Sequence, residues 1–272
     1  MSKAFDEEIT AEHLPSVCGA SGVHQTPTEP APYLEEPEPA ESLLGSIPLS
    51  ALSADFQPLV DLRSGETAGF EALPRVRSEG FNDAAELFAR ASFEKTIGEL
   101  GRLVREIASR ECIGTALYVS VHPGELKYGN LVRPDDPIAL HDAPVWLQFS
   151  QPSFATLGTQ IVQELAGRSD VSVVLDDFGA GPATLKQVIE LSPAAIKIDS
   201  ELIAGLDRSR RKRLAVSGIA ALCEELGAVA IAKGVDCQAE MEAVIDCGIQ
   251  LAQGYLLGEP APLPAISIWP PK

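Results

Sequence analysis

Eight short apolar segments of strand-forming composition recur along this chain, and most are separated by longer segments with the apolar spacing of helices. Helices between strands act as crossovers that bring successive strands into parallel order. The alternation therefore places the chain in the α/β class with a mostly parallel sheet. The predicted strands are residues 55–62, 67–73, 116–121, 145–150, 171–177, 194–199, 228–235 and 249–256. The predicted helical segments are residues 84–110, 155–167, 183–191, 210–227 and 237–247.

The first two predicted strands differ from the others because only the segment Arg63-Ser64-Gly65-Glu66 separates them. A connection of this length that contains a glycine is typical of a hairpin, which makes the opening pair antiparallel. Eight strands in about 220 residues fit a (β/α)8 barrel. We therefore expect such a barrel with an antiparallel pair at its start.

Most of the predicted strands are apolar along their length and then end in a polar residue. The carboxyl ends of parallel strands in a barrel open on one face, where active sites lie. A single polar residue at a strand end is usually explained by turn capping, but seven strand ends that share one face indicate a functional ring. The polar ends are Glu71, Ser120, Gln148, Asp176 with Asp177, Lys197, Lys233 with Asp236, and Gln253.

The charge of the chain is strongly negative and unevenly distributed. Lys and Arg total 21 against 39 Asp and Glu, a net charge of −18, and residues 1–50 carry nine acids, one base and seven of the 21 prolines. A segment of this composition has too little apolar surface to offset the entropy that it would lose on ordering. We therefore expect residues 1–50 to be a disordered acidic tail and residues 51–272 to form the barrel domain. The tail is interpreted as a solubilising leader or as a tether that docks a partner.

The composition also limits the partners and the setting. The negative charge argues against a nucleic acid or an anionic membrane held by bulk electrostatics. The five cysteines include no C-x-x-C pair, and only four histidines accompany them, which argues against a structural zinc site. The first ten residues are acidic where a signal peptide is basic and then apolar, and no apolar run reaches membrane-spanning length. We expect a protein of the reducing cytoplasm, with Cys112, Cys223 and Cys247 as small core residues.

Four motifs carry a resemblance to a known family. They are Glu71-Ala72-Leu73-Pro74-Arg75, Leu175-Asp176-Asp177-Phe178-Gly179-Ala180-Gly181, Ile196-Lys197-Ile198-Asp199 and Leu251-Ala252-Gln253-Gly254-Tyr255-Leu256. In this order and at this spacing, the chain resembles the EAL-domain family, the phosphodiesterases and receptors of the bacterial second messenger cyclic di-GMP. The resemblance covers residues 53–262. It implies a modified TIM-type (β/α)8 barrel whose first strand runs antiparallel.

Active members of this family hydrolyse a phosphodiester with two Mg²⁺ or Mn²⁺ ions held by carboxylates and an amide. The resemblance implies that Glu71, Asp176 and Asp177 stand at metal-ligand positions and that Lys197 is the lysine that orients the catalytic water. It also implies that Arg75 contacts a phosphate. The ligand-binding positions that the resemblance implies are Gln57, Glu71, Leu73, Arg75, Asp177, Lys197, Asp236 and Gln253.

Three positions depart from the family pattern, and all three bear on the metal ions. Ser120 replaces an asparagine, Gln148 replaces a glutamate, and Lys233 replaces the first glutamate of an E-G-V-E motif that here reads Lys233-Gly234-Val235-Asp236. Together these changes remove three units of negative charge from the ring. A unit charge at 4 Å is worth about 4 kcal/mol at an effective dielectric constant near 20. We therefore expect weak metal binding, with Lys233 in the region of a lost ion and paired with Glu71 or Asp176.

The resulting prediction is a catalytically degenerate EAL domain that acts as a regulatory module, either by binding cyclic di-GMP or by binding a protein partner. No cofactor is expected, and Mg²⁺ or Mn²⁺ would be needed only by an active site. The alternatives are an active metal-dependent cyclic di-GMP phosphodiesterase and an unrelated barrel enzyme with Lys233 or Lys197 as nucleophile. Three further features receive interpretations. His122 is interpreted as a polar rim residue, and helices near the middle of the barrel as a dimer contact that the resemblance implies. The basic run 208–213 is interpreted as a solvated helix face, with docking of an acidic partner or of the acidic tail of this chain as the alternative.

Overall fold

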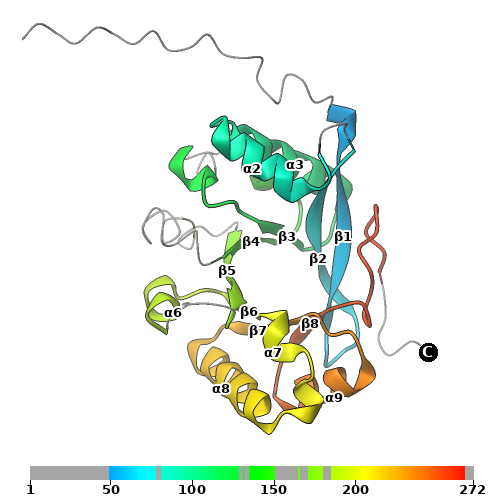
Figure 1. Cartoon of the computed structure of the whole chain (residues 1–272), viewed down its shortest axis with the longest axis vertical. Coiled ribbons are helices and arrows are strands. Elements are labelled where there is room, and N and C mark those ends of the chain that lie inside the picture. Colours follow the sequence, from blue (N-terminus) through cyan, green and yellow to red (C-terminus); the bar gives the residue numbers. More distant parts are fainter. Residues whose placement is uncertain are drawn as a thin grey trace, which may run out of the picture. The chain divides into compact units, whose positions relative to one another are not determined.

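All eight predicted strands form, and they close into a barrel in chain order (Figure 1). The computed structural model describes residues 49–77, 81–128, 131, 135–150, 165, 171–179 and 185–266. The closed barrel of eight strands in chain order confirms the expected (β/α)8 architecture. The strands are β1 (Leu52–Asp61), β2 (Thr67–Val76), β3 (Leu117–Ser120), β4 (Val145–Phe149), β5 (Val171–Phe178), β6 (Ala195–Ile198), β7 (Val229–Lys233) and β8 (Leu251–Gln253).

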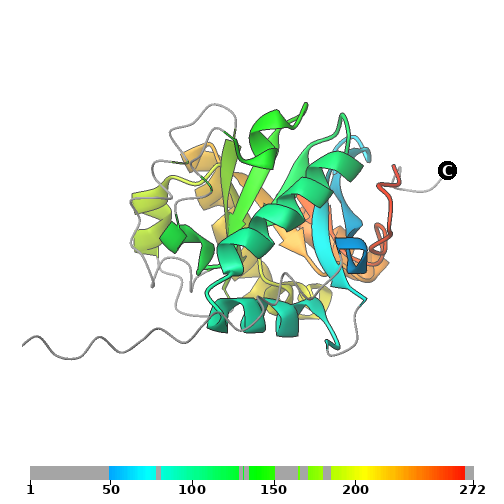
Figure 2. The same cartoon turned by 90° about the horizontal axis from the view of Figure 1, so that it is seen from above.

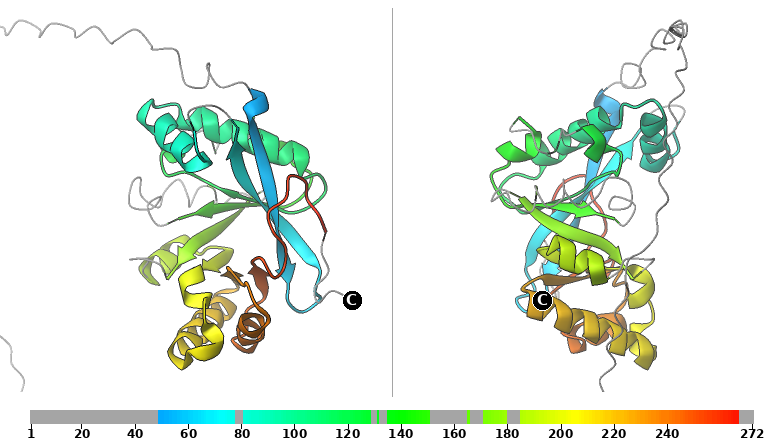
Figure 3. Two further views of the ribbon diagram at one scale, coloured as in Figure 1. Left: turned by 45° about the vertical axis from the view of Figure 1, so that its right-hand side comes forward. Right: turned by 90° about the vertical axis from the view of Figure 1, so that its left-hand side faces the viewer.

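The first strand runs against the others, as the short connection after it predicts. β1 pairs antiparallel with both β2 and β8, and every pair from β2–β3 to β7–β8 is parallel. The turn is stabilised by Asp61, whose carboxylate accepts hydrogen bonds from the backbone N–H groups of Arg63 and Ser64, each at 2.8 Å. Gly65 has φ 75°, a conformation that favours glycine. β1 and β2 thus form a long ribbon in the barrel wall (Figure 3).

The helices of the described region lie outside the strands. α2 and α3 lie on one side of the barrel, and α8 and α9 on the opposite side (Figures 1 and 3). The ends of α8 follow local rules, because the Ser209 hydroxyl accepts from the Lys212 N–H and Gly227 ends the helix at φ 69°. The helices are α2 (Ala84–Phe93), α3 (Ile97–Glu111), α6 (Leu185–Leu191), α7 (Ser200–Ile203), α8 (Arg210–Leu226) and α9 (Gln238–Asp246). The 3-10 turns are η1 (Leu49–Ala51), η2 (Glu125–Tyr128), η4 (Pro137–Leu140) and η5 (Leu206–Arg208).

The prediction of one continuous helix over residues 84–110 is wrong, because α2 and α3 are separate helices at an angle to each other (Figure 2). The buried face of α2 includes Ala91, and the positions three and four residues later hold Glu94 and Lys95. A straight helix would bring these two charges onto the buried face, which is unfavourable. Lys95 instead takes φ 61°, and the Thr96 N–H donates to the Ala91 carbonyl at 2.8 Å.

The barrel interior below the polar strand ends is filled by an apolar layer. Tyr118 on β3 and Trp146 on β4 stack with ring centroids 5.3 Å apart and planes inclined by 8°. A second and larger core lies between the strands and the outer helices. The fully or largely buried members of the inner layer are Leu59, Tyr118, Val174, Ala195, Ile231 and Leu251. The inner layer is therefore a packed floor and not a channel.

A buried ion triad ties α3 to the segment that follows β3. The Arg105 guanidinium forms an ion pair with Glu125 and another with Asp136, the latter at 2.8 Å, and all three side chains are at most 1% exposed. The helix approaches this triad through Gly101, because a Cβ built there would lie 1.8 Å from a Glu125 carboxylate oxygen. The Glu125 carboxylate also accepts from the His122 N–H at 2.8 Å, so the triad fixes the chain at the end of β3.

Some expectations fall outside the described residues. These are the predicted helix over 155–167 and the acidic tail over 1–50, both almost entirely outside, and the last two residues of the D-D-F-G-A-G motif. The three cysteines expected in the core, Cys112, Cys223 and Cys247, are buried and unpaired, which confirms that prediction. Within the described ranges, no helix is both long and apolar enough to cross a membrane.

Candidate functional site

The polar strand ends do converge on one face of the barrel. On the parallel strands, the inward-facing residue of the apolar floor is followed two positions later by a polar residue. Because side chains alternate between the two faces of a strand, this polar side chain also faces inward. Thus Tyr118 precedes Ser120, Val174 precedes Asp176, and Ala195 precedes Lys197. On the antiparallel β1, the polar residue Gln57 precedes Leu59 instead. The polar layer consists of Gln57, Glu71, Ser120, Gln148, Asp176, Lys197, Lys233 and Gln253.

Glu71 is the centre of this layer, and three side chains from other strands contact its carboxylate. Lys197 Nζ lies 2.8 Å from Oε2, Gln253 Nε2 donates to the same oxygen at 2.6 Å, and Gln148 Nε2 donates to Oε1 at 2.7 Å. Lys197 has no exposed surface, and Glu71 is 6% exposed. Burial by itself raises the pKa of Glu71, but the charge and hydrogen bond of Lys197 together with the two amides lower it to about 2. Glu71 is therefore ionised and its two oxygens are occupied.

Lys233 forms a second cluster with the paired aspartates of β5. Its Nζ lies 3.2 Å from Asp176 Oδ1 and 2.5 Å from Asp177 Oδ1. The expected pairing of Lys233 with Asp176 is present, whereas Glu71 is paired with Lys197 instead. Burial lowers the pKa of Lys233, but the two carboxylates outweigh this effect and raise it, so the group is an ammonium ion.

The chain around Asp176 and Asp177 is shaped for this contact. Asp177 has φ 53°, an uncommon conformation for a residue with a side chain, and the pairing of β5 with β6 shifts register at this point. The Asp177 N–H donates to Asp176 Oδ1 at 2.7 Å. Burial raises the pKa of Asp176, and the charges of Lys197 and Lys233 oppose that rise. The layer and the adjacent Asp177 thus bring together three carboxylates and two ammonium groups.

Two hollows open on either side of the Lys233 contact. The hollow on the β1 side, of about 400 Å³, is lined by Gln57, Leu73, Lys233, Asp236 and Gln253 among others. The hollow on the β3 side, of about 340 Å³, is lined by Ser120, Gln148, Asp176 and Asp177 among others. Lys233 lines the first hollow and both aspartates line the second, so their ion pair adjoins both hollows.

Two of the predicted ligand-binding residues lie outside the ion-pair clusters, and of these Asp236 lines the β1-side hollow whereas Arg75 lines neither hollow. Arg75 is 45% exposed in its side chain, and its Nε donates to Asp55 on the neighbouring strand at 2.7 Å. Asp236 lines the β1-side hollow, and its Oδ1 accepts from the Tyr255 N–H at 3.0 Å. Asp236 therefore helps to shape the segment after β8 and does not join the two ion-pair clusters.

Several lining residues were not predicted from the sequence. Ser200 and Tyr255 line the β1-side hollow, while Phe88 and Ser150 line the β3-side hollow. Ser200 directly follows the motif Ile196–Asp199, and Tyr255 lies within the motif Leu251–Leu256, so their position beside these motifs was a usable signal. His122, expected as a polar rim residue, lines the β3-side hollow with its ring centroid 6.0 Å from that of Phe88, and burial lowers its pKa. Phe88 comes from α2, and nothing in its local sequence marked it.

Two buried acceptors in the polar layer have no hydrogen-bond donor within the described part of the chain. These are the side-chain oxygens of Gln148 and Gln253, residues that are 1% and 3% exposed. A buried polar atom without a partner is costly, so each of these oxygens favours a donor from a bound molecule or water.

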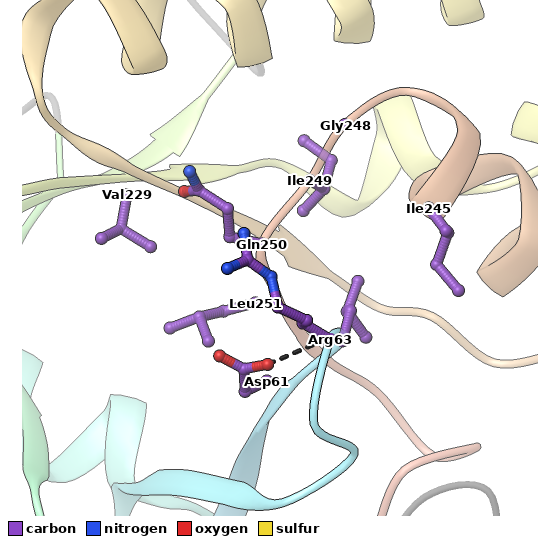
Figure 4. Close-up of a pocket in the computed structure, with 9 residues that line it drawn as sticks. Asp61, Arg63, Val229, Ile245, Gly248, Ile249, Gln250 and Leu251 are labelled. Atoms are coloured by element: carbon purple, nitrogen blue, oxygen red, sulfur yellow. Dashed lines mark hydrogen bonds between the residues drawn. The ribbon is translucent and has the colours of Figure 1, made fainter.

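A larger hollow of about 520 Å³ lies at the opposite end of the barrel, beside the β1–β2 turn (Figure 4). Its lining is mainly apolar and includes Val229, Ile245 and Ile249, with Asp61 already engaged by the turn. It lacks the convergent buried charges of the other face, and we assign the candidate site to the strand carboxyl ends.

The fold and the site define the class of protein: a closed α/β barrel with an antiparallel first strand and a cluster of acids and lysines at the carboxyl ends of its strands. The chain belongs to the EAL domain family, whose model matches residues 40–260. This match confirms the resemblance seen in the sequence motifs.

Individual relatives agree with this assignment. The protein y4lL of Sinorhizobium fredii is 28% identical over 268 residues, which cover 94% of this chain and 32% of y4lL. The cyclic di-GMP phosphodiesterase RocR of Pseudomonas aeruginosa is 31% identical over 90 residues, which cover 33% of this chain and 23% of RocR. This chain thus spans about a third or less of the length of these relatives. The solved structure of the PaMucR phosphodiesterase in complex with c-di-GMP has the same fold, with a TM-score of 0.70 at 24% identity over 82% of this chain and 95% of that chain.

Proposed function

We propose that this chain is a non-hydrolytic EAL domain that works as a regulatory module in cyclic di-GMP signalling. The observation that carries the proposal is the position of the Lys233 ammonium group, in contact with both Asp176 and Asp177. These are two of the three carboxylates that the family resemblance assigns to divalent ions. The third, Glu71, is occupied by Lys197 and two amides.

The donor set does not fit a pair of divalent ions. Mg²⁺ and Mn²⁺ select clustered oxygen anions, and each carboxylate here already has an ammonium partner. A divalent ion near Asp176 and Asp177 would approach Lys233 closely and be repelled by it. Among the described residues, no group of three or more His, Cys, Asp or Glu side chains is arranged to hold a metal ion. We therefore infer that these residues do not support phosphodiester hydrolysis by a pair of metal ions.

Nucleotide binding without hydrolysis is supported by the two hollows and by the buried acceptors. The hollows flank the Lys233 ion pair, and the unpartnered oxygens of Gln148 and Gln253 favour a ligand with N–H or O–H donors. Arg75, four residues after Glu71 on β2, offers an exposed guanidinium for a phosphate, provided that it leaves Asp55. RocR is named as a cyclic di-GMP phosphodiesterase and PaMucR was solved with c-di-GMP, so this dinucleotide is the ligand that we propose.

The test is calorimetric titration of cyclic di-GMP into the purified chain, once with excess Mg²⁺ or Mn²⁺ and once with a chelator. Chromatography of the nucleotide afterwards shows whether it is intact. The proposal expects binding of similar affinity in both conditions and an unchanged nucleotide. The absence of heat at high-micromolar nucleotide would leave the protein-binding form of the proposal.

Two results would favour the alternative, an active phosphodiesterase. One is a linear dinucleotide product, and the other is binding that the chelator abolishes. Arg75→Ala is the site variant and should abolish the heat. Arg110→Ala is the matched control, because Arg110 is 66% exposed in its side chain and lies on the outer helix α3.

A further inference from the structure

A cluster of bases stands at the start of α8 on an otherwise acidic chain. Residues 208–213 read Arg-Ser-Arg-Arg-Lys-Arg and contain five of the 21 bases of the chain. Arg210, Arg211 and Arg213 are exposed, and Arg208 is 81% exposed in its side chain. We call Arg208, Arg210, Arg211 and Arg213 the α8 basic patch.

Most of this patch has no compensating charge. Arg208 lies 3.5 Å from the Asp207 carboxylate, and Lys212 is engaged by the carbonyls of Glu201 and Ala204 at 2.5 and 2.6 Å. Within the described ranges, the guanidinium groups of Arg210, Arg211 and Arg213 form no ion pair. The positions three and four residues after each of them carry no acid, so α8 offers no intrahelical partner.

The patch is also unfavourable for the helix itself. The amino end of a helix carries a partial positive charge and favours acids, yet the first turn of α8 holds four bases and no acid. The acids of α8, Glu224 and Glu225, lie at its carboxyl end, where bases would be favoured. A local rule that is broken without a compensating contact in the same chain is expected at a functional surface.

We propose that the α8 basic patch is the docking site for an acidic segment of a partner protein, rich in Asp and Glu. This inference deepens the proposed function, because it names the chemistry of a partner for the regulatory module. A narrow acidic peptide can contact the patch without contacting the acidic remainder of the chain. Repulsion from acids farther away than the Debye length of about 8 Å is screened at physiological ionic strength. Duplex nucleic acid and anionic membranes present wide anionic surfaces, which the net charge of −18 disfavours. A second copy placed symmetrically on the patch would bring like charges together.

The α8 basic patch is linked to the candidate site through α7. Lys212, within the same turn of α8, binds two carbonyls of the α7 region. The first residue of α7, Ser200, lines the β1-side hollow and would lie 2.9 Å from a Cβ at Gly234, the neighbour of Lys233. A partner bound to the patch therefore lies next to α7, the helix that borders the β1-side hollow.

The test measures binding of a fluorescein-labelled oligoglutamate peptide to the whole chain by anisotropy, with an oligoglutamine peptide of equal length as the probe control. The triple variant Arg210→Gln, Arg211→Gln and Arg213→Gln should weaken oligoglutamate binding by about tenfold or more. The matched control removes the same charge elsewhere: Arg90→Gln, Arg110→Gln and Lys186→Gln, whose side chains are 58%, 66% and 77% exposed. It should bind like the unmodified chain.

Three results would overturn the proposal. They are no saturable binding of oligoglutamate, an equal loss of affinity in both triple variants, and tighter binding of duplex DNA or phosphatidylserine vesicles than of oligoglutamate. Circular dichroism of both variants establishes that they are folded. The nucleotide titration is carried out separately, so a failure of cyclic di-GMP binding and a failure of peptide binding are distinguishable.

Discussion

Replacing Lys233 by glutamate should strengthen the binding of a divalent cation at Asp176 and Asp177. The substitution removes the ammonium group that lies 3.2 Å from Asp176 and 2.5 Å from Asp177 and adds a carboxylate in its place. Asp176 and Asp177 then lose the ammonium group that β7 presents to them, and a third carboxylate takes its place beside them. Hard divalent ions bind such oxygen clusters.

The magnitude follows from the distances. Two unit charges 4 Å apart interact by about 4 kcal/mol at an effective dielectric constant of 20, and a divalent ion doubles this to about 8 kcal/mol. Because the Lys233 side chain is 26% exposed, we halve the value for solvent screening, to about 4 kcal/mol. Removal of the ammonium group alone is thus worth about a thousandfold in the dissociation constant, and we expect at least about a hundredfold tighter Mn²⁺ binding.

The assay is a titration with Mn²⁺ in which free Mn²⁺ is measured by electron paramagnetic resonance. Lys233→Met separates the loss of the ammonium from the gain of the carboxylate. Lys186→Glu is the charge-matched control, because Lys186 lies on α6 with a side chain that is 77% exposed. If folded Lys233→Glu binds Mn²⁺ no better than the unmodified chain or the control, the reasoning that Lys233 excludes the metal is refuted.

Three further predictions concern the scaffold. Arg105→Met leaves Glu125 and Asp136 buried without their cation and should lower the free energy of unfolding by about 3–5 kcal/mol in urea denaturation, whereas Arg110→Met should change it by less than about 0.5 kcal/mol; equal effects would contradict a role for the triad. Gly254→Ala places a Cβ 2.1 Å from the Val235 carbonyl oxygen, so the variant should lose stability and cyclic di-GMP binding together, and unchanged values of both would contradict this close approach. Burial raises the pKa of Cys112 to about 11, so iodoacetamide at pH 8 should modify the exposed Cys237 and spare Cys112 until the chain is unfolded, as peptide mass mapping would show; rapid modification of Cys112 in the folded chain would contradict its burial.

The amino-acid sequence by itself determined the strands, their order and the composition of the polar layer. These features follow from local rules: short apolar runs form strands, the four-residue connection after Asp61 forms a hairpin, and a two-residue period carries a polar residue at a strand end onto the inner face. Glu71, Gln148, Asp176, Lys197, Lys233 and Gln253 were therefore predictable as neighbours before any of their contacts were known.

Only the tertiary structure decided which of these side chains pair with each other. Lys197 and Glu71 are 126 positions apart, and Lys233 and Asp177 are 56 apart, so their contacts depend on the stagger of the strands around the closed barrel and on side-chain reach. The same holds for the triad of Arg105, which joins a helix to two later segments. Local periodicity is a property of a few consecutive residues, whereas a charge pair across a barrel is set by the closure of the whole sheet.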